Sequence, residues 1–200
     1  MERLRLRDLR SPLAGPFDLS LDAGECVAVT GPSGSGKSLF LRMIADLDPH
    51  EGEVWLDGRP RRAMSPPDWR RHATYLAAES GWWADEVAAH FAPARLDPAR
   101  TLADRLGLKP ELLAGPVLRL STWERQRLTL VRGLVLDSPV LLLDEPTGPL
   151  DEASVVRVEA LLRERLDAGV ALLLVTHDPA QAGRLGRRRF RMARGRLEPA

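Results

Sequence analysis

The residues with the clearest chemical meaning lie in a glycine-rich stretch, residues 31–38, which reads GPSGSGKS. This stretch fits the phosphate-binding pattern G-x-x-x-x-G-K-[ST] without deviation. Its glycines allow backbone N–H groups to surround phosphate oxygens, and the helix expected after the loop adds its positive N-terminal end. Lys37 would bridge the β- and γ-phosphates of a nucleotide, and the Ser38 hydroxyl would ligate Mg²⁺. The predicted nucleotide contacts are Gly31, Pro32, Ser33, Gly34, Ser35, Gly36, Lys37, Ser38 and Leu39.

Two carboxylates and a histidine follow apolar runs further along the chain. Asp144 and Glu145 come directly after the run 140–143, and His177 comes soon after the run 170–175. In an open α/β sheet, ligands bind beyond the carboxyl ends of the strands. Asp144 is expected to hold magnesium, Glu145 to orient and deprotonate an attacking water, and His177 to contact the γ-phosphate or hold Glu145 in place. The predicted catalytic residues are Glu145, His177 and Lys37, and the predicted metal ligands are Ser38 and Asp144.

The segments that position these groups alternate between predicted strands and predicted helices. An apolar run, 25–30, leads into the glycine-rich loop, and apolar residues at helical spacing follow it over 39–44. The runs 140–143 and 170–175 are predicted strands, with a helix expected over about 151–168 between them. Continuous apolar runs are typical of strands buried on both faces of a parallel sheet. We therefore predict an α/β fold with a mostly parallel sheet.

The other segments indicate smaller elements. Residues 3–7 alternate arginine and leucine, which predicts a half-buried strand at a sheet edge. Residues 53–56 resemble a strand, and Asp57 with Gly58 suggests a turn after it. The stretch 59–70, rich in proline and arginine, is expected to be a loop. Residues 80–136 are mostly helical in pattern, although prolines interrupt them.

Composition excludes several classes of protein. The 200 residues carry 29 Lys and Arg against 28 Asp and Glu, a formal net charge of +1. A general nucleic-acid or membrane-surface binder would need a basic excess, so we expect no nucleic-acid partner. No apolar run approaches the roughly 18 residues that span a bilayer, and the charged start predicts no secretory signal peptide. Cys26 is the single cysteine, which excludes an internal disulfide and fits a reducing cytosol.

Together the motifs resemble the ATP-binding cassette (ABC) ATPase family along nearly the whole chain. The matching pieces, in chain order, are 22–25 (DAGE), 31–38 (GPSGSGKS), 52–54 (GEV), 57–58 (DG), 120–121 (LS), 141–147 (LLLDEPT), 150–151 (LD) and 175–178 (VTHD). The resemblance implies one domain over residues 1–200: a P-loop NTPase with a RecA-like, mostly parallel sheet, an antiparallel β lobe and a helical lobe over about 80–135. It also implies ATP and Mg²⁺ as ligands.

The resemblance further implies an assembly. Two cassettes, identical or different, would sandwich two ATP molecules head to tail, and residues 148–151, with Asp151, occupy the family's D-loop, where the cassettes touch. The most similar type is a compact ATPase subunit that powers a separate multi-span membrane permease. Such a subunit is cytoplasmic and is held at the inner face of the membrane through that permease.

The family's signature, which faces the nucleotide of the partner cassette, departs from its usual pattern. The resemblance implies Leu-Ser-Gly-Gly-Gln, whereas residues 120–124 read LSTWE. The serine stays as a hydroxyl donor and helix cap, the threonine and tryptophan add bulk, and the glutamate opposes a phosphate electrostatically. Arg125 and Arg127 are candidates to offset that charge, and we expect the sandwich to form in an altered way. The predicted signature residues are Ser121, Thr122, Trp123 and Glu124.

Three further positions differ from the family. Ala78 occupies the position at which the family usually has a glutamine that senses Mg²⁺ and couples to the permease. Glu79, the next residue, is either a substitute for that glutamine or an ordinary exposed glutamate. No aromatic residue lies in 7–15, where the family stacks one on adenine. Base stacking is worth on the order of 1–3 kcal/mol, so we expect weaker ATP binding unless a residue such as Arg10 stacks instead. Leu39 replaces a threonine but keeps its backbone N–H.

Two other clusters have open interpretations. Trp82 and Trp83 lie where the family docks a permease helix, and they fit that role and core packing equally well. Residues 184–196 contain seven arginines, which could bind lipid headgroups or nucleic acid. We favour a solvated sheet edge for them.

The leading functional prediction is an ATP-hydrolysing subunit of an ABC transporter. The alternative is a soluble ABC ATPase that acts as an ATP-dependent regulatory switch without a permease, and the altered signature favours it. A degenerate module with little turnover is disfavoured because Lys37, Ser38, Asp144, Glu145 and His177 are all present. A GTPase is disfavoured because the chain has no N-K-x-D guanine-binding motif.

Overall fold

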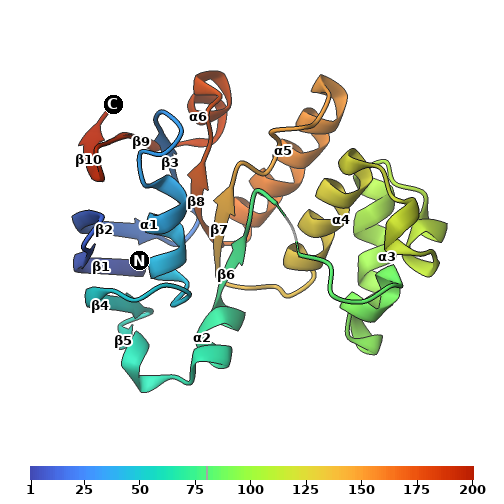
Figure 1. Cartoon of the computed structure of the whole chain (residues 1–200), viewed down its shortest axis with the longest axis horizontal. Coiled ribbons are helices and arrows are strands. Elements are labelled where there is room, and N and C mark those ends of the chain that lie inside the picture. Colours follow the sequence, from blue (N-terminus) through green and yellow to red (C-terminus); the bar gives the residue numbers. More distant parts are fainter. Residues whose placement is uncertain (80) are drawn as a thin grey trace.

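The strands of the computed structural model, which describes residues 1–79 and 81–200, form two sheets (Figure 1). The larger sheet has the strand order β10-β9-β3-β8-β7-β6 and is parallel except between β9 and β10. Its strands are β3 (Cys26–Thr30), β6 (Ala73–Leu76), β7 (Val140–Asp144), β8 (Ala171–Val175), β9 (Arg188–Ala193) and β10 (Arg196–Pro199). The prediction of a mostly parallel sheet is confirmed.

The smaller sheet is antiparallel, with the order β2-β1-β4-β5. Its strands are β1 (Glu2–Ser11), β2 (Ala14–Asp22), β4 (Glu51–Leu56) and β5 (Arg59–Pro60). The prediction that residues 3–7 form an edge strand is wrong, because β1 pairs with β2 on one side and β4 on the other. Leu4 and Leu6 face the core, while Arg5 lies over the Trp55 ring at 5.3 Å. The arginines therefore mark the solvent face of this sheet.

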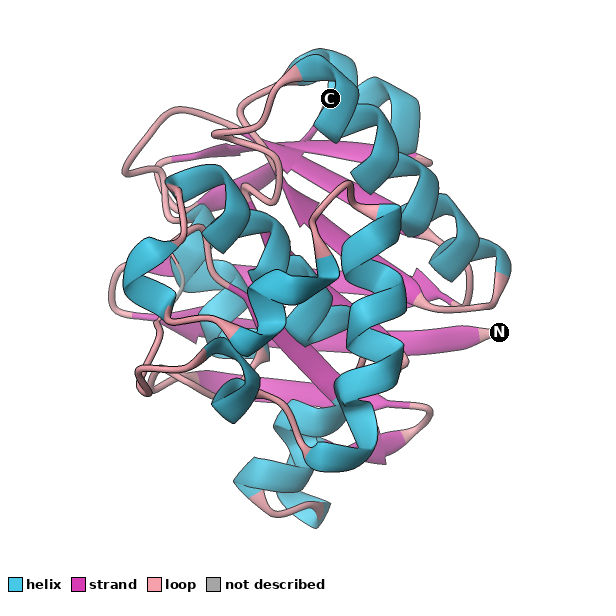
Figure 2. Cartoon of the chain, turned by 90° about the vertical axis from the view of Figure 1, so that its right-hand side faces the viewer, coloured by secondary structure: helices cyan, strands magenta, loops and turns pink. Residues whose placement is uncertain are grey.

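Alternating side chains of the buried strands contribute to two separate cores. Leu142 and Leu173 pack with α1 (Lys37–Ile44) and the small sheet, whereas Leu141 and Leu172 pack with α3 (Leu96–Arg105), α4 (Thr122–Leu134) and α5 (Glu152–Asp167). In Figure 1 the small sheet and the α3–α4 region lie on opposite sides of the central strands, and Figure 2, seen from the α3–α4 side, shows the helices of that side in front of the strands. The helices are α1 (Lys37–Ile44), α2 (Pro66–His72), α3 (Leu96–Arg105), α4 (Thr122–Leu134), α5 (Glu152–Asp167) and α6 (Pro179–Leu185).

The stretch 59–70 is more ordered than the predicted loop, because it contains β5 and a 3₁₀ turn and runs into α2. Ser65 caps α2 by accepting a hydrogen bond from the Asp68 N–H, and prolines occupy the first helical positions, where their missing N–H groups are not needed. Trp69 is fully buried and donates its Nε1–H to the Ile44 carbonyl at 2.8 Å. The prolines on which the loop prediction rested therefore lie at the start of a helix, and Trp69 anchors that helix to the end of α1.

Residues 81–135, which we name the helical lobe, contain α3, α4 and several 3₁₀ turns, most of them at prolines. Ser80, the first residue of the predicted lobe, lies outside the described residues. The interior of the lobe is filled by buried leucines, among them Leu102, Leu106, Leu113 and Leu128. Within the described part of the chain, no helix combines the length and the apolar character needed to cross a bilayer.

Candidate nucleotide-binding site

The glycine-rich loop joins β3 to α1 and is shaped by glycine conformations. Gly31, Gly34 and Gly36 have φ values of 148°, 75° and 104°, a region that side chains disfavour. A Cβ on Gly31 would lie 2.4 Å from the Met192 carbonyl oxygen, so no larger residue fits there. The Lys37 ammonium donates to the Gly31 and Pro32 carbonyls at 2.9 and 3.0 Å, which holds it across the loop.

A cavity of about 870 Å³ opens above this loop. The carboxyl ends of β3, β7 and β8 meet there because the three strands are parallel neighbours. The cavity gathers Lys37, Ser38, Asp144, Glu145 and His177 from these separate segments. Its lining also includes Gly31, Ser33, Gly34, Ser35, Gly36, Leu39 and Ala78. Of the predicted nucleotide contacts, Pro32 is placed in the loop but is not among the lining residues.

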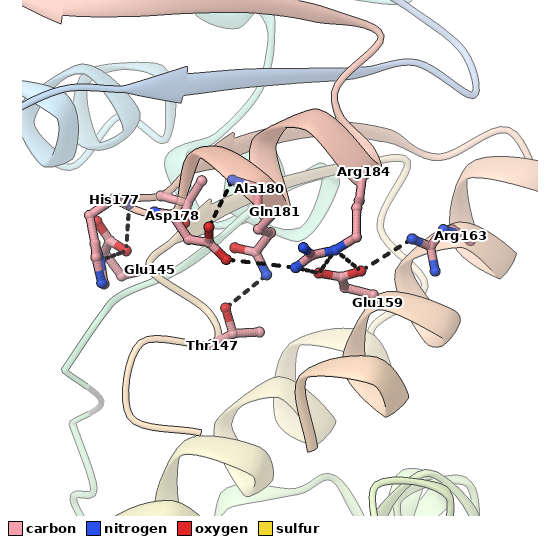
Figure 3. Close-up of polar contacts among 10 residues, drawn as sticks. Glu145, Thr147, Glu159, Arg163, His177, Asp178, Ala180, Gln181 and Arg184 are labelled. Atoms are coloured by element: carbon pink, nitrogen blue, oxygen red, sulfur yellow. Dashed lines mark hydrogen bonds and ion pairs between the residues drawn. The ribbon is translucent and has the colours of Figure 1, made fainter. Parts of the chain in front are cut away.

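Glu145 and His177 are in direct contact at the mouth of the cavity (Figure 3). The Glu145 Oε2 atom accepts from the His177 backbone N–H at 3.1 Å and lies 2.7 Å from His177 Nδ1. Glu145 has a φ of 48°, in the left-handed region that is unfavourable for a glutamate. Its N–H donates to Val175 O, and its own carbonyl accepts from the Gly148 N–H, which fixes this conformation. Strained residues of this kind cluster at functional sites.

Asp144 has a partner that the sequence did not indicate. Its carboxylate is buried and accepts a hydrogen bond from the Tyr75 hydroxyl at 2.9 Å. Burial and the charge of Asp144 raise the pKa of Tyr75 still further above neutral pH. Tyr75 is opposite Leu142 in the parallel pair of β6 and β7. Tyr75 could have been identified from the sequence as a polar residue on the strand next to β7.

Buried polar contacts fix the segment after Glu145. Gln181 is fully buried on α6 and donates to the Thr147 hydroxyl at 2.8 Å. One turn further along the same face of α6, Arg184 pairs with Glu159 of α5 at 2.7 Å, and Glu159 also accepts from Arg163 (Figure 3). Since Glu159 is only 3% exposed, this pairing ties α6 to α5. The sequence did not reveal Thr147, Gln181 or Glu159 as supports of the site.

The cavity also has an end that the sequence did not assign to the nucleotide site, formed in part by the arginine-rich stretch 184–196. Leu13, which is 81% exposed, lines it together with Arg194 and Gly195 from the turn between β9 and β10. The Gly195 N–H donates to the Ser35 carbonyl at 3.0 Å, which attaches this turn to the loop. Arg10, the predicted stacking residue, instead pairs with Glu51 at 3.0 Å and Asp8 at 3.1 Å.

Other predicted residues lie away from the cavity lining. Ser121, Thr122, Trp123 and Glu124 form the start of α4. Asp151 caps α5, where its carboxylate accepts from Ser154 N at 2.8 Å; this backbone hydrogen bond lowers the pKa of Asp151. Among the described residues of the 73–79 segment, Ala78 and not Glu79 lines the cavity; Glu79 is exposed.

The two neighbouring tryptophans differ in burial. Trp82 packs against the core of the helical lobe, whereas Trp83 is 71% exposed. Both rings lie 4.9 Å from the Arg132 guanidinium and pack edge-on against His90. Burial lowers the pKa of Arg132.

The loop and its surroundings fit a magnesium nucleotide. The Ser35 hydroxyl is buried and has no hydrogen-bond partner within the described residues, as expected of a donor reserved for a phosphate. No group of three or more acidic, histidine or cysteine side chains in the described chain could enclose a metal. Ser38 and Asp144, which both line the cavity, are the residues that could hold Mg²⁺ together with phosphate oxygens, as is usual beside nucleotides.

Comparisons with known proteins agree with this geometry. The family model described as ABC transporter matches residues 15–148. The chain is 34% identical over 188 residues to the thiamine import ATP-binding protein ThiQ of Haemophilus influenzae, covering 88% of this chain and 86% of that protein. It is 35% identical over 196 residues to the macrolide export ATP-binding/permease protein MacB of Bordetella avium, covering 90% of this chain but only 30% of MacB.

Solved structures share the fold at lower sequence identity. An ATP-binding subunit of an ABC transporter has a TM-score of 0.88 at 22% identity, with 98% of this chain and 88% of that chain covered. A dimeric ATP-binding cassette bound to ADP and Pi has a TM-score of 0.83 at 23% identity, with 98% of each chain covered. The predicted P-loop fold is thereby confirmed. Because the family model covers well over half of its residues, the chain belongs to the ABC transporter family as one of its ATPase cassettes.

Proposed function

We propose that this chain binds Mg·ATP in the cavity above residues 31–38, hydrolyses it, and uses the cycle to power a separate membrane permease. The observation that carries the proposal is the meeting of Lys37, Ser38, Asp144, Glu145 and His177 around one cavity. The family supports ATP hydrolysis in general. The residue roles, the Mg²⁺ site, the pairing of cassettes across ATP, and a location at the inner face of the membrane are part of the proposal.

Each side chain has a defined task in this mechanism. The loop amides and Lys37 bind and orient the phosphates. Glu145 accepts a proton from the attacking water; its contacts with His177 use Oε2, so the other oxygen can serve as the base. His177 holds that carboxylate in place from the end of β8. Ser38 and Asp144 would hold Mg²⁺, which would supply neutralisation of the phosphate charge.

Tyr75 is proposed to orient the Asp144 carboxylate toward the metal. Tyr75→Phe removes the 2.9 Å hydrogen bond and leaves the ring in place. Loss of a residue that orients a metal ligand typically weakens metal binding by 10- to 100-fold. We expect half-maximal ATP turnover to require about tenfold more Mg²⁺, with the rate at saturating Mg²⁺ changing much less. An unchanged Mg²⁺ titration would remove Tyr75 from the site.

Trp83 is the residue most suited to contact a permease. It is exposed beside a small cavity lined by Tyr75, Gly81, Arg132 and Leu136, and its ring is held by Arg132. Exposed aromatic residues held in place are frequent centres of protein interfaces. We expect Trp83→Ala to move the chain from the membrane fraction to the soluble fraction when it is co-expressed with its permease. Val156→Ala, at another exposed apolar residue, is the control, and equal sedimentation of both variants would contradict the docking role.

A soluble ATP-dependent switch without a permease is the second candidate. It is favoured by the altered signature and by the exposed position of Glu79, away from the cavity lining. This candidate predicts that the wild-type chain stays in the soluble fraction even when it is co-expressed with a candidate membrane permease. Co-sedimentation with that protein would exclude the candidate.

A further inference from the structure

The turn between β9 and β10 contains a residue that its backbone geometry does not favour. Residues 194–195, an arginine and a glycine, connect the two paired strands, and their φ values are both positive, 48° and 71°. Two-residue turns with positive φ at both positions favour asparagine or aspartate before glycine. The turn between β4 and β5 follows this rule, because Asp57 and Gly58 occupy it with φ values of 48° and 75°. The turn alone therefore does not account for an arginine at position 194.

The other residues with positive φ show the same contrast. Within the described residues, six residues other than glycine have a positive φ. Four of them are aspartates, a residue type that tolerates this region: Asp8, Asp46, Asp57 and Asp137. The remaining two are Glu145 and Arg194, and both line the nucleotide cavity. Residues held in an unfavourable backbone conformation cluster at functional sites, so Arg194 is a candidate for a role in this cavity.

Backbone contacts fix the position of the turn. The Gly195 N–H donates to the Ser35 carbonyl of the phosphate-binding loop at 3.0 Å, and the Gly195 carbonyl accepts from the Gly15 N–H at 2.8 Å. A Cβ on Gly195 would lie 2.8 Å from the Leu13 carbonyl oxygen, so the turn directly contacts the segment that carries Leu13. These contacts place Arg194 and Leu13 at the same end of the cavity.

The two side chains at this end are suited to the faces of an aromatic ring. Leu13 is a large apolar side chain exposed beside a nucleotide site. Arg194 is also exposed and pairs with no carboxylate of the described residues, whereas Arg188 in the same arginine-rich stretch pairs with the buried Glu25. A guanidinium is planar and stacks on aromatic faces, and an aliphatic side chain packs against them. A nucleobase offers two such faces.

We propose that Leu13 and Arg194 hold the nucleobase of the bound nucleotide between them, with the guanidinium on one face and the leucine on the other. The inference rests on the proposed ATP site above residues 31–38. It assigns to the turn between β9 and β10 the stacking that the sequence led us to expect from residues 7–15. In this arrangement Arg194 binds the base, and the loop and Lys37 bind the phosphates.

Two ligands separate contacts with the base from contacts with the phosphates. Mg·ATP carries a base, whereas Mg·tripolyphosphate carries phosphates alone. Isothermal titration calorimetry of each ligand into the full chain carrying Glu145→Gln, which is expected to leave the nucleotide intact, gives two dissociation constants for each protein. The test variant is Arg194→Asn, because asparagine favours the same turn and removes the guanidinium. The control is Arg196→Asn, which removes the same charge at an exposed position of β10 outside the cavity lining.

We expect Arg194→Asn to weaken Mg·ATP binding by about tenfold, as for the loss of one stacking partner, and to leave Mg·tripolyphosphate binding unchanged. Arg196→Asn is expected to change neither constant. Leu13→Tyr, added to Arg194→Asn, provides an aromatic ring on the opposite face of the base. We expect it to restore about tenfold in ATP affinity, again with no effect on tripolyphosphate. A purely structural role of the turn would affect both ligands and would not be repaired at position 13.

Three results would overturn the inference. Equal weakening of both ligands by Arg194→Asn would show that the arginine acts on the phosphates or on the loop. Unchanged ATP binding by the same variant would show that Arg194 does not contact the base. Failure of Leu13→Tyr to raise ATP affinity would place the base elsewhere. If the chain carrying Glu145→Gln alone binds neither ligand, the proposed function on which the inference rests is overturned instead.

Discussion

Replacing Lys37 with alanine is expected to weaken ATP binding by about 10- to 150-fold, because hydrogen bonds to charged groups contribute about 1.5–3 kcal/mol. Lys37 holds its ammonium across the loop, 2.9 Å from the Gly31 carbonyl, where it can turn to the phosphates. Lys37→Arg is expected to fail as well, since a planar guanidinium cannot occupy the place of a compact ammonium. Equilibrium titration of a fluorescent ATP analogue into the purified chain measures the loss.

The chain contains a matched control for this prediction. Lys109 is the one other lysine in the sequence and is exposed in the helical lobe. Lys109→Ala removes the same charge and should bind ATP as the unmodified chain does. If Lys37→Ala binds ATP with unchanged affinity, the loop at 31–38 is not the phosphate site.

Glu145→Gln is expected to stop turnover while ATP stays bound. The amide matches the carboxylate in shape and can still accept from the His177 N–H, but it cannot take a proton from water. General-base catalysis typically contributes 10²–10⁴-fold, so we expect phosphate release to fall by about 10³-fold. The measurement is phosphate release at saturating Mg·ATP by the purified chain.

The control for this prediction is Glu152→Gln, which changes an exposed glutamate in the first turn of α5. It should release phosphate at the rate of the unmodified chain. Turnover by Glu145→Gln at a similar rate would show that another group activates the water.

The sequence predicted the parts of the fold that depend on local patterns. The strands β3, β7 and β8 could be predicted from their apolar runs alone, without knowledge of which strands pair with them. Lys37, Glu145 and His177 follow shortly after the ends of these strands. The glycines of the loop were also readable, because few other residues adopt their φ values.

Features that depend on distant neighbours were not predictable. β1 appeared to be an edge strand because an alternating pattern reports burial of one face and says nothing of how many strands pair with it. Tyr75 meets Asp144 only because β6 pairs with β7 in a particular register, and Gln181 meets Thr147 only because α6 packs beside the loop. The orientation of Arg125 depended on the Val117 carbonyl, which lies in a separate turn of the lobe.

The central claim is that ATP binds in the cavity formed by the loop after β3 and the ends of β7 and β8. Hydrogen exchange of the Glu145→Gln chain, compared with and without Mg·ATP, tests it directly. We predict slower exchange in peptides covering 31–39 and 144–148, and no slowing when Lys37→Ala is added. The chain has a second cavity of about 660 Å³, lined by residues between Asp46 and Arg62. Slowing confined to that second cavity, with 31–39 unchanged, would contradict the account.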